Sequence, residues 1–329
     1  MTHDWISSLT ETILSDPSYE LSPEEALKLA RLPSQHDLVL IEHAGKIRRH
    51  FWGDVIFTCS IINAKSGHCT ENCAFCAQSS HHEARIKTYP LLDMESLVAS
   101  ALQRAQEGAS RFAMVTSGFK LKQAEIDTIC RAAERIRKES GLIVCASVGV
   151  VTIPYLRQMQ SSGITRYHHN LETARSYFHE VCTTHDYEAD IEAVLLARQE
   201  GMAVCSGGVM GLGETWEQRV ELAVTLRELD VDAIPLNFLT PIPGTRFEKK
   251  SPLKAAEALK IIAITRFLNP TRHITICGGR EITLADQQSR LFEAGADGLM
   301  IGNYLTTLGR AAADDREMIR ALSLHIENR

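Results

Sequence analysis

Three cysteines, Cys69, Cys73 and Cys76, lie within eight residues at the spacing C-x3-C-x2-C. Thiolates this close together are suited to binding metal. A structural zinc site takes four ligands, and only His68 or His81 is near enough in the sequence to complete one. An iron–sulfur cube held by three cysteines instead leaves one iron free to chelate a small molecule. The spacing therefore favours a [4Fe-4S] cluster with an open corner over zinc.

An aromatic residue, Phe75, stands directly before the last cysteine and makes the motif more specific. With it, the stretch 67–76 resembles the radical S-adenosylmethionine (SAM) superfamily. That resemblance implies that Cys69, Cys73 and Cys76 hold a [4Fe-4S] cluster that binds and cleaves SAM. The radical released in this way is strong enough to attack unactivated C–H bonds.

Composition and charge exclude several classes of protein. The chain has 329 residues, of which 44% are hydrophobic and 23% are charged, enough for one large domain or two small ones. The formal net charge is -6 and the basic residues are scattered, which argues against nucleic acid or an anionic membrane as partner. Neither a secretory signal nor a membrane span is visible. Nine cysteines without an export signal predict a cytoplasmic protein with reduced or metal-bound thiols.

The first 53 residues predict a helical extension. Ser22 to Glu25 form a capping box with proline at the first helical position, and a second helical run covers about 37–51. We expect residues 1–53 to act as a lid or a brace on the main domain.

From residue 54 to residue 310 the pattern alternates between strands and helices. The strand-like runs are 55–62, 111–117, 142–149, 166–172, 202–209, 233–240, 273–279 and 298–302. Such alternation predicts a parallel sheet, and eight units predict an α/β fold of the closed (β/α)8 TIM-barrel type. A doubly wound open sheet is the alternative. Residues 311–329 predict a C-terminal helix.

Four more cysteines fall within predicted barrel strands one, three, five and seven: Cys59, Cys145, Cys205 and Cys277. Because side chains alternate between the two faces of a strand, all four can point into the barrel lumen. Soft thiolates gathered in a dry interior suit a second iron–sulfur cluster better than they suit packing alone.

Over residues 54–305 the sequence resembles one family within that superfamily, the biotin synthases. The resemblance lies in the runs 65–79, 169–173, 205–215 and 279–281. It implies sulfur insertion into dethiobiotin, with the sulfur donated by an auxiliary cluster deeper in the barrel. It also implies a flavodoxin- or ferredoxin-type electron donor, and it leaves a homodimer open. By resemblance, Phe75 and Glu172 lie against SAM, while Asn170 and Asn237 face SAM or the ureido ring of the substrate.

The auxiliary ligands depart from the family pattern. The family usually holds a [2Fe-2S] cluster with three cysteines on strands two, three and five and an arginine on strand seven. Ala113 and Thr275 stand where two of those ligands would be. Cys145 and Cys205 match the other two ligands, and Cys59 and Cys277 lie at neighbouring lumen positions. Four thiolates predict a four-iron cluster rather than [2Fe-2S].

Four other residues are assigned no part in the chemistry. Cys130 lies on the apolar stripe of a helix and is expected to be an ordinary buried residue. Cys182, in a turn after strand four, is likewise assigned to packing. His168 and Asp190 replace the asparagine and the basic residue that are common in the family.

Three other functions compete with this one. A related radical SAM barrel, hydrogenase-maturase-like or methylornithine-synthase-like, would share the first cluster but would not need a sulfur donor in the lumen. Conversion of dethiobiotin to biotin would separate these two. A zinc-bound scaffold should be colourless and free of iron, and a pure electron carrier would not need an open cluster corner.

Overall fold

The computed structural model describes residues 2–327. The α-helices are α1 (Thr2–Ser15), α2 (Pro23–Ala30), α3 (Asp37–Trp52), α4 (Met94–Gln106), α5 (Gln123–Ser140), α6 (Ile153–Ser161), α7 (Phe178–Val181), α8 (Tyr187–Gln199), α9 (Trp216–Glu228), α10 (Ala255–Leu268), α11 (Arg280–Thr283) and α12 (Ala312–Ala321). Short 3₁₀ segments are η1 (Ser34–His36), η2 (Arg175–Tyr177) and η3 (Ala285–Leu291). The strands are β1 (Val55–Lys65), β2 (Arg111–Thr116), β3 (Ile143–Ser147), β4 (Ile164–His168), β5 (Ala203–Cys205), β6 (Gly208–Met210), β7 (Ala233–Phe238), β8 (His273–Ile276), β9 (Gly298–Met300) and β10 (His325–Ile326).

The strands form a closed parallel barrel, which confirms the predicted fold. Their order is β1-β2-β3-β4-β5-β7-β8-β9, with β6 paired to β7. Strand β9 pairs back to β1 through Phe57 and Gly298, and this pairing closes the wall. The apolar core lies between this wall and the surrounding helices. Within residues 2–327, no helix is long and apolar enough to cross a membrane.

The fifth barrel strand is interrupted, whereas the sequence predicted one continuous strand over 202–209. Strand β5 ends at Cys205 and β6 begins at Gly208. At Gly207 an added Cβ would lie 2.1 Å from the carbonyl oxygen of Pro235 on β7. The two backbones therefore approach too closely for any side chain at this position, and regular pairing stops.

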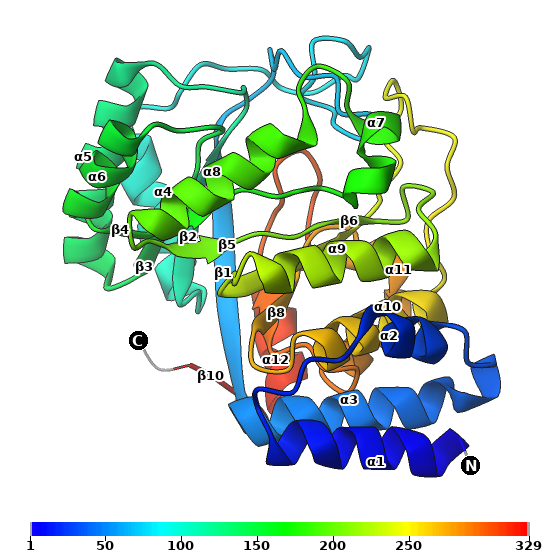
Figure 1. Ribbon diagram of the computed structural model, residues 1–329. Coiled ribbons are helices and arrows are strands. Elements are labelled where there is room, and N and C mark those ends of the chain that lie inside the picture. The colour runs from blue at the N-terminus through cyan, green and yellow to red at the C-terminus, as the bar shows by residue number, and fades with distance from the viewer. Residues whose placement is uncertain (1, 328–329) are drawn as a thin grey trace.

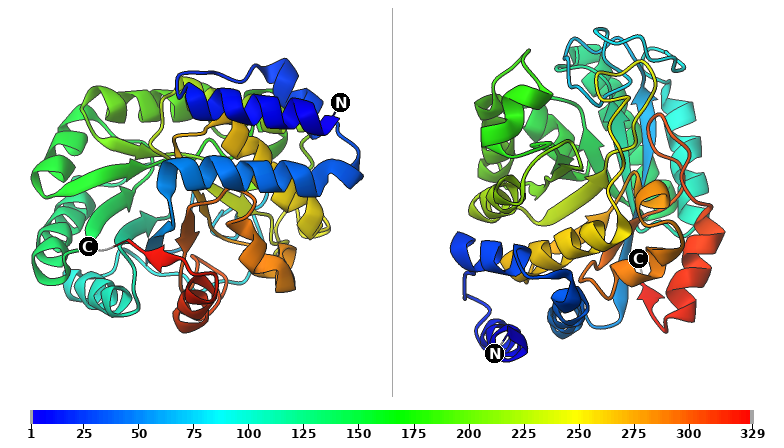
Figure 2. Two further views of the ribbon diagram at one scale, coloured as in Figure 1. Left: turned by 90° about the horizontal axis from the view of Figure 1, so that it is seen from below. Right: turned by 90° about the vertical axis from the view of Figure 1, so that its right-hand side faces the viewer.

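The N-terminal helices lie at the end of the barrel opposite to the cysteine loop. In Figure 1, α1 to α3 lie below the sheet, and the chain that follows β1 is above it. Both views of Figure 2 agree, with α1 and α3 across the base. Helix α3 packs on α1 and α10, and α2 packs on α9 and α10. These helices are therefore placed to brace the barrel, and they do not form a lid over the loops.

The C-terminal segment differs from the single helix predicted over 311–329. Helix α12 ends at Ala321, and the strand β10 follows at His325 and Ile326. Strand β10 pairs in parallel with the start of β1. Residues 328 and 329 lie outside the described part of the chain. The three predicted segments, 1–53, 54–310 and 311–329, remain a prediction as domains.

Candidate active site

Strand β1 runs straight into the loop that carries Cys69, Cys73 and Cys76, at the carboxyl end of the barrel. Backbone bonds hold this loop on two sides: the Ala74 amide donates to the Val181 carbonyl at 2.8 Å, and the Phe247 amide donates to Ala74 at 3.1 Å. The loop is therefore fixed by segments from two distant parts of the barrel.

The structure brings the three predicted thiols together. Burial, together with the neighbouring Cys69, raises the pKa of Cys76 to about 12. The pKa of Cys73 is also well above its ordinary value. Thiols in this state keep their protons until a metal replaces them.

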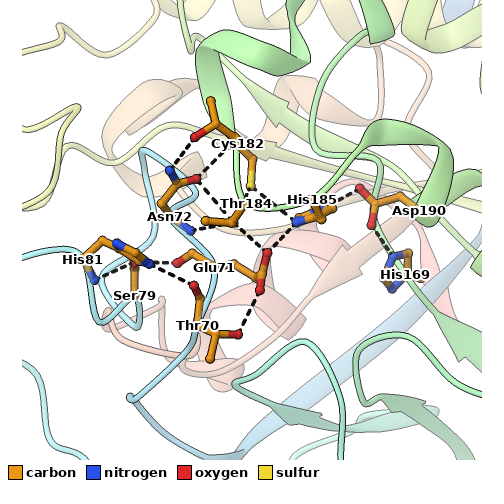
Figure 3. A network of polar contacts seen from close by, with 11 residues as sticks. Thr70, Glu71, Asn72, Ser79, His81, His169, Cys182, Thr184, His185 and Asp190 are labelled. Carbon is orange, nitrogen blue, oxygen red and sulfur yellow. Dashed lines mark hydrogen bonds and ion pairs between the residues drawn. The ribbon is translucent and has the colours of Figure 1, made fainter.

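A polar network joins this loop to the segment after α7 (Figure 3). Glu71, between the first two cysteines, accepts a bond from His185 Nδ1 at 2.6 Å. His185 Nε2 lies 3.2 Å from Asp190, and Asp190 lies 2.7 Å from His169 Nε2. Burial disfavours the charged imidazole, but the bonds to Asp190 and Cys182 raise the pKa of His185 to about 11. An imidazolium thus links the carboxylates of the two segments.

Cys182 belongs to this network, which the sequence did not reveal. Interactions with Cys73, His185 and Thr184 lower the pKa of Cys182 to about 3. One ligand atom each from Glu71, Cys182 and His185 lie within 4.8 Å of one another, as in a metal site. The His185 imidazolium already supplies positive charge there, so we assign the group to an ion-pair network. Asp190, without an assigned role from sequence, belongs to it as well.

The upper of two connected cavities lies under the cysteine loop. Its volume is about 230 Å³. Its lining includes Phe75, Cys76, Asn170, Glu172 and Asn237. The predicted SAM and substrate residues therefore face one cavity.

Glu172 is held in an uncommon conformation on the wall of this cavity. Its φ angle is +63°, a left-handed value that non-glycine residues rarely adopt. Burial raises the pKa of its carboxyl to about 8, and the charge on Asp190 adds to the effect. Asn170 connects Glu172 to His168, because its Nδ2 donates to Glu172 at 3.4 Å and His168 Nε2 donates to its Oδ1 at 2.8 Å. Strain and a shifted pKa in a cavity are typical of functional residues.

The backbone satisfies half of the hydrogen-bonding capacity of the Asn237 side chain on β7. Its Oδ1 accepts a bond from the Gly278 amide at 3.0 Å, and its Nδ2 donates to the Gly208 carbonyl at 3.3 Å. An amide side chain has two N–H donors and two acceptor lone pairs. One donor and one acceptor therefore remain for a ligand.

The lower cavity is the barrel lumen itself. Its lining contains all four predicted lumen cysteines, Cys59, Cys145, Cys205 and Cys277. Ala113 and Thr275 line it too. The two cavities share Ile61, His168, Pro235, Cys277 and Met300 as common lining. A molecule in the upper cavity therefore lies directly above the lumen.

The lumen thiols differ in acidity. Cys277 Sγ donates to the Thr275 carbonyl at 3.6 Å. Its interaction with Cys59 lowers the pKa of Cys59 and raises that of Cys277. Burial raises the pKa of Cys205 to about 12 and also raises that of Cys145. Cys130, in contrast, is packed in α5 outside the lumen, as predicted.

Two arginines also line the lumen and were missed from the sequence. Arg111 lies on β2 and Arg166 on β4. The Nε atom of each is buried without a hydrogen-bond partner among the described residues. Side chains alternate between the two faces of a strand, and this alternation places both arginines inward. The same reasoning that identified the lumen cysteines could therefore have identified them.

Comparisons with known proteins agree with this geometry. The Radical SAM superfamily model matches residues 64–226, and the Biotin and Thiamin Synthesis associated domain matches residues 235–325. A relative from Syntrophus aciditrophicus (strain SB), named biotin synthase, is 52% identical over 316 residues, which cover 96% of this chain and 97% of the relative. A biotin synthase from Geotalea uraniireducens (strain Rf4) is 48% identical over 324 residues, 98% of each chain.

Solved structures share the fold at lower identity. Methylornithine synthase has a TM-score of 0.82 and 18% identity, with 97% of each chain covered. A maturase of the [FeFe]-hydrogenase has a TM-score of 0.83 and 17% identity, with 99% of this chain and 76% of that chain covered. At these identities the likeness supports the barrel alone, and it does not support either alternative activity.

A pH titration can test the state of Glu172. Because its folded-state pKa is raised from 4.5 to about 8, the carboxyl should be protonated below this pH and ionised above it. The stability that the protonated form contributes is present below pH 4.5 and is lost as the pH rises through about 8. Infrared difference spectra should show a carboxylic acid band that disappears near pH 8 and is missing from Glu172→Gln.

The exposed Glu192 offers a matched control, because Glu192→Gln should leave that band unchanged. A band that persists in Glu172→Gln would contradict the assignment.

Proposed function

The chain belongs to the biotin synthase family of radical SAM enzymes, and from this membership we propose how its residues share the reaction. Members convert dethiobiotin to biotin by inserting sulfur, and this chain has that activity. It uses SAM and a [4Fe-4S] cluster. The residue roles that follow are proposals.

We propose that Cys69, Cys73 and Cys76 hold the [4Fe-4S] cluster and that Phe75 and Glu172 contact SAM. When bound, this cluster supplies the electron that splits SAM and yields the 5'-deoxyadenosyl radical. The protein orients SAM: Phe75 lies beside the last cysteine, and Asn170 positions the Glu172 carboxyl. Asn170 also has its Oδ1 fixed by His168, which restricts rotation of its amide.

Dethiobiotin is proposed to bind lower in the same cavity, near Asn237. The cyclic urea of the substrate has N–H donors and a carbonyl acceptor. These match the donor and the acceptor that Asn237 has left after its bonds to Gly278 and Gly208. Asn170 faces the same space and serves SAM or the ureido ring. Apolar lining such as Val209 and Leu239 excludes water from the reacting carbons.

The auxiliary cluster is proposed to bind in the lumen, with Cys59, Cys145, Cys205 and Cys277 as ligands. Its chemistry is to supply the sulfur that enters the substrate. The lining fits such a group, because it combines four thiols with two buried guanidinium Nε atoms that lack partners. Four thiolates in place of three and an arginine favour a four-iron cluster over [2Fe-2S].

A single observation carries this proposal: Cys277 lines both cavities. A substrate above Cys277 would lie between the cysteine loop and the lumen thiols. Hydrogen abstraction from one side and sulfur delivery from the other then require no movement of the substrate between sites.

Other partners are proposed from family membership alone. A flavodoxin- or ferredoxin-type protein would deliver the electrons, and the chain would work in the cytoplasm. A homodimer is proposed on the same ground.

Replacing any one of Cys69, Cys73 and Cys76 by Ala should abolish SAM cleavage, because each supplies one of three cluster ligands. The measurement is anaerobic formation of 5'-deoxyadenosine from SAM and dithionite. Cys130→Ala is a matched control, since that thiol lies in α5 outside the lumen. Formation at the parent's rate in a Cys69, Cys73 or Cys76 variant would refute the assignment.

Asn237→Ala should weaken dethiobiotin binding roughly tenfold or more, because leaving a buried polar partner unpaired costs about 1–3 kcal/mol. Asn237→Asp keeps the acceptor for the Gly278 amide but lacks the N–H donor, so it separates ligand contact from loop support. Equilibrium binding of dethiobiotin and of SAM should show a smaller loss for SAM. Equal loss for both ligands, or no loss for either, would speak against this position of the substrate.

The iron content of the lumen tests the proposed cluster type. A chain with Cys69, Cys73 and Cys76 all replaced, purified anaerobically, retains only the lumen thiols. Iron analysis should give about four irons per chain, falling when Cys59 or Cys277 is also replaced. Two irons with the spectrum of an oxidised diamagnetic [2Fe-2S] centre, unaffected by those two replacements, would overturn it.

A further inference from the structure

Arg166 is a cation without a partner in the lumen. It extends from β4 between two cysteine-bearing strands, because it is paired in register with Cys145 on β3 and with Ala203 on β5, two residues before Cys205. Its Nε is buried and unsatisfied, and none of its nitrogens has a hydrogen bond or ion pair to residues 2–327. Arg166 therefore has five N–H donors and a positive charge that the protein alone does not use.

The other lumen arginine is already paired. Arg111 Nη1 donates to Glu327 at 2.7 Å and to Ser110 Oγ at 3.2 Å. The lumen lining contains no aspartate or glutamate within the described residues. The only lining groups able to carry negative charge near Arg166 are the thiols of Cys59, Cys145, Cys205 and Cys277.

A guanidinium whose Nε is buried without a partner is unfavourable, so a counter-charge is expected beside it. A four-iron cluster bound by four thiolates keeps a net negative charge, and that charge would fall next to Arg166.

We propose that Arg166 is the cationic partner of the auxiliary cluster, donating hydrogen bonds to its sulfur atoms and stabilising its more negative, reduced state. This inference rests on the proposed lumen cluster. Arg166 would contact the cofactor but would not coordinate iron, because the four cysteines already supply the ligands.

Potentiometric titration of the lumen cluster tests the assignment. The background is the full-length chain with Cys69, Cys73 and Cys76 replaced by Ala, reconstituted anaerobically with ferrous iron and sulfide. Arg166→Met keeps the length of the side chain without its charge, and Arg166→Lys keeps the charge without the planar fork. Arg111→Met is the matched control, because Glu327 already compensates that charge.

We expect the midpoint potential to become more negative in Arg166→Met, to stay nearer to the parent's in Arg166→Lys, and to shift less in Arg111→Met. Hydrogen bonds and net charge are the terms that set such potentials, whereas a purely structural role would leave the potential unchanged. An unshifted potential in Arg166→Met with iron retained would overturn the inference, as would equal shifts in Arg111→Met and Arg166→Met.

Loss of iron from the Arg166 variants also tests the proposal. If Arg166→Met loses the cluster and Arg166→Lys retains it, the charge is what holds the cluster, and the proposal stands. Loss from both variants overturns it, because charge is then not the deciding property. A parent background that binds no iron refutes the lumen cluster as well, which distinguishes failure of the proposed function from failure of this inference.

Discussion

The architecture depends on what fills the inside of the barrel. Parallel barrels of this type usually pack their interior with bulky branched side chains, which leaves no lumen for chemistry. Here cysteine, alanine, proline and threonine stand at many inward positions, such as Cys145, Ala113, Pro235 and Thr275. The wall must then draw its stability from the helices packed outside it, and the N-terminal helices contribute by covering the base, where α3 lies against α10. A barrel with a hollow interior therefore depends on the helices packed against its outside.

The local pattern of the sequence was enough to predict the barrel and most of the site. The spacing of Cys69, Cys73 and Cys76 is a property of one loop, and the inward direction of Cys59 and Cys277 follows from the two-residue period of a strand. What escaped prediction depends on contacts between distant segments. The break after Cys205 comes from the approach of the Pro235 backbone, and Cys182 reaches Cys73 only because the chain after α7 folds over the cysteine loop.

Arg166 was overlooked for the same reason, because its significance depends on contacts between distant segments. A sequence shows that an arginine points inward, but it does not show whether an acidic partner meets it there. Arg111 pairs with Glu327, which is more than 200 residues away in the sequence. Arg166 has no acidic partner in the described chain. The strained Glu172 is similar, because its left-handed φ angle occurs where it bridges to Gly208, a residue that is not its neighbour in sequence.

The short strand β10 has a further consequence. By pairing with the start of β1, it carries Glu327 to the floor of the barrel, where the carboxylate neutralises Arg111. The charge of this tail is therefore part of the electrostatic balance of the lumen. Cutting the chain before residue 325, or pulling its tail away with a fused partner, would leave the interior with two uncompensated cations instead of one. Changes at this end of the chain, far from the cysteine loop, would therefore alter the charge balance of the lumen.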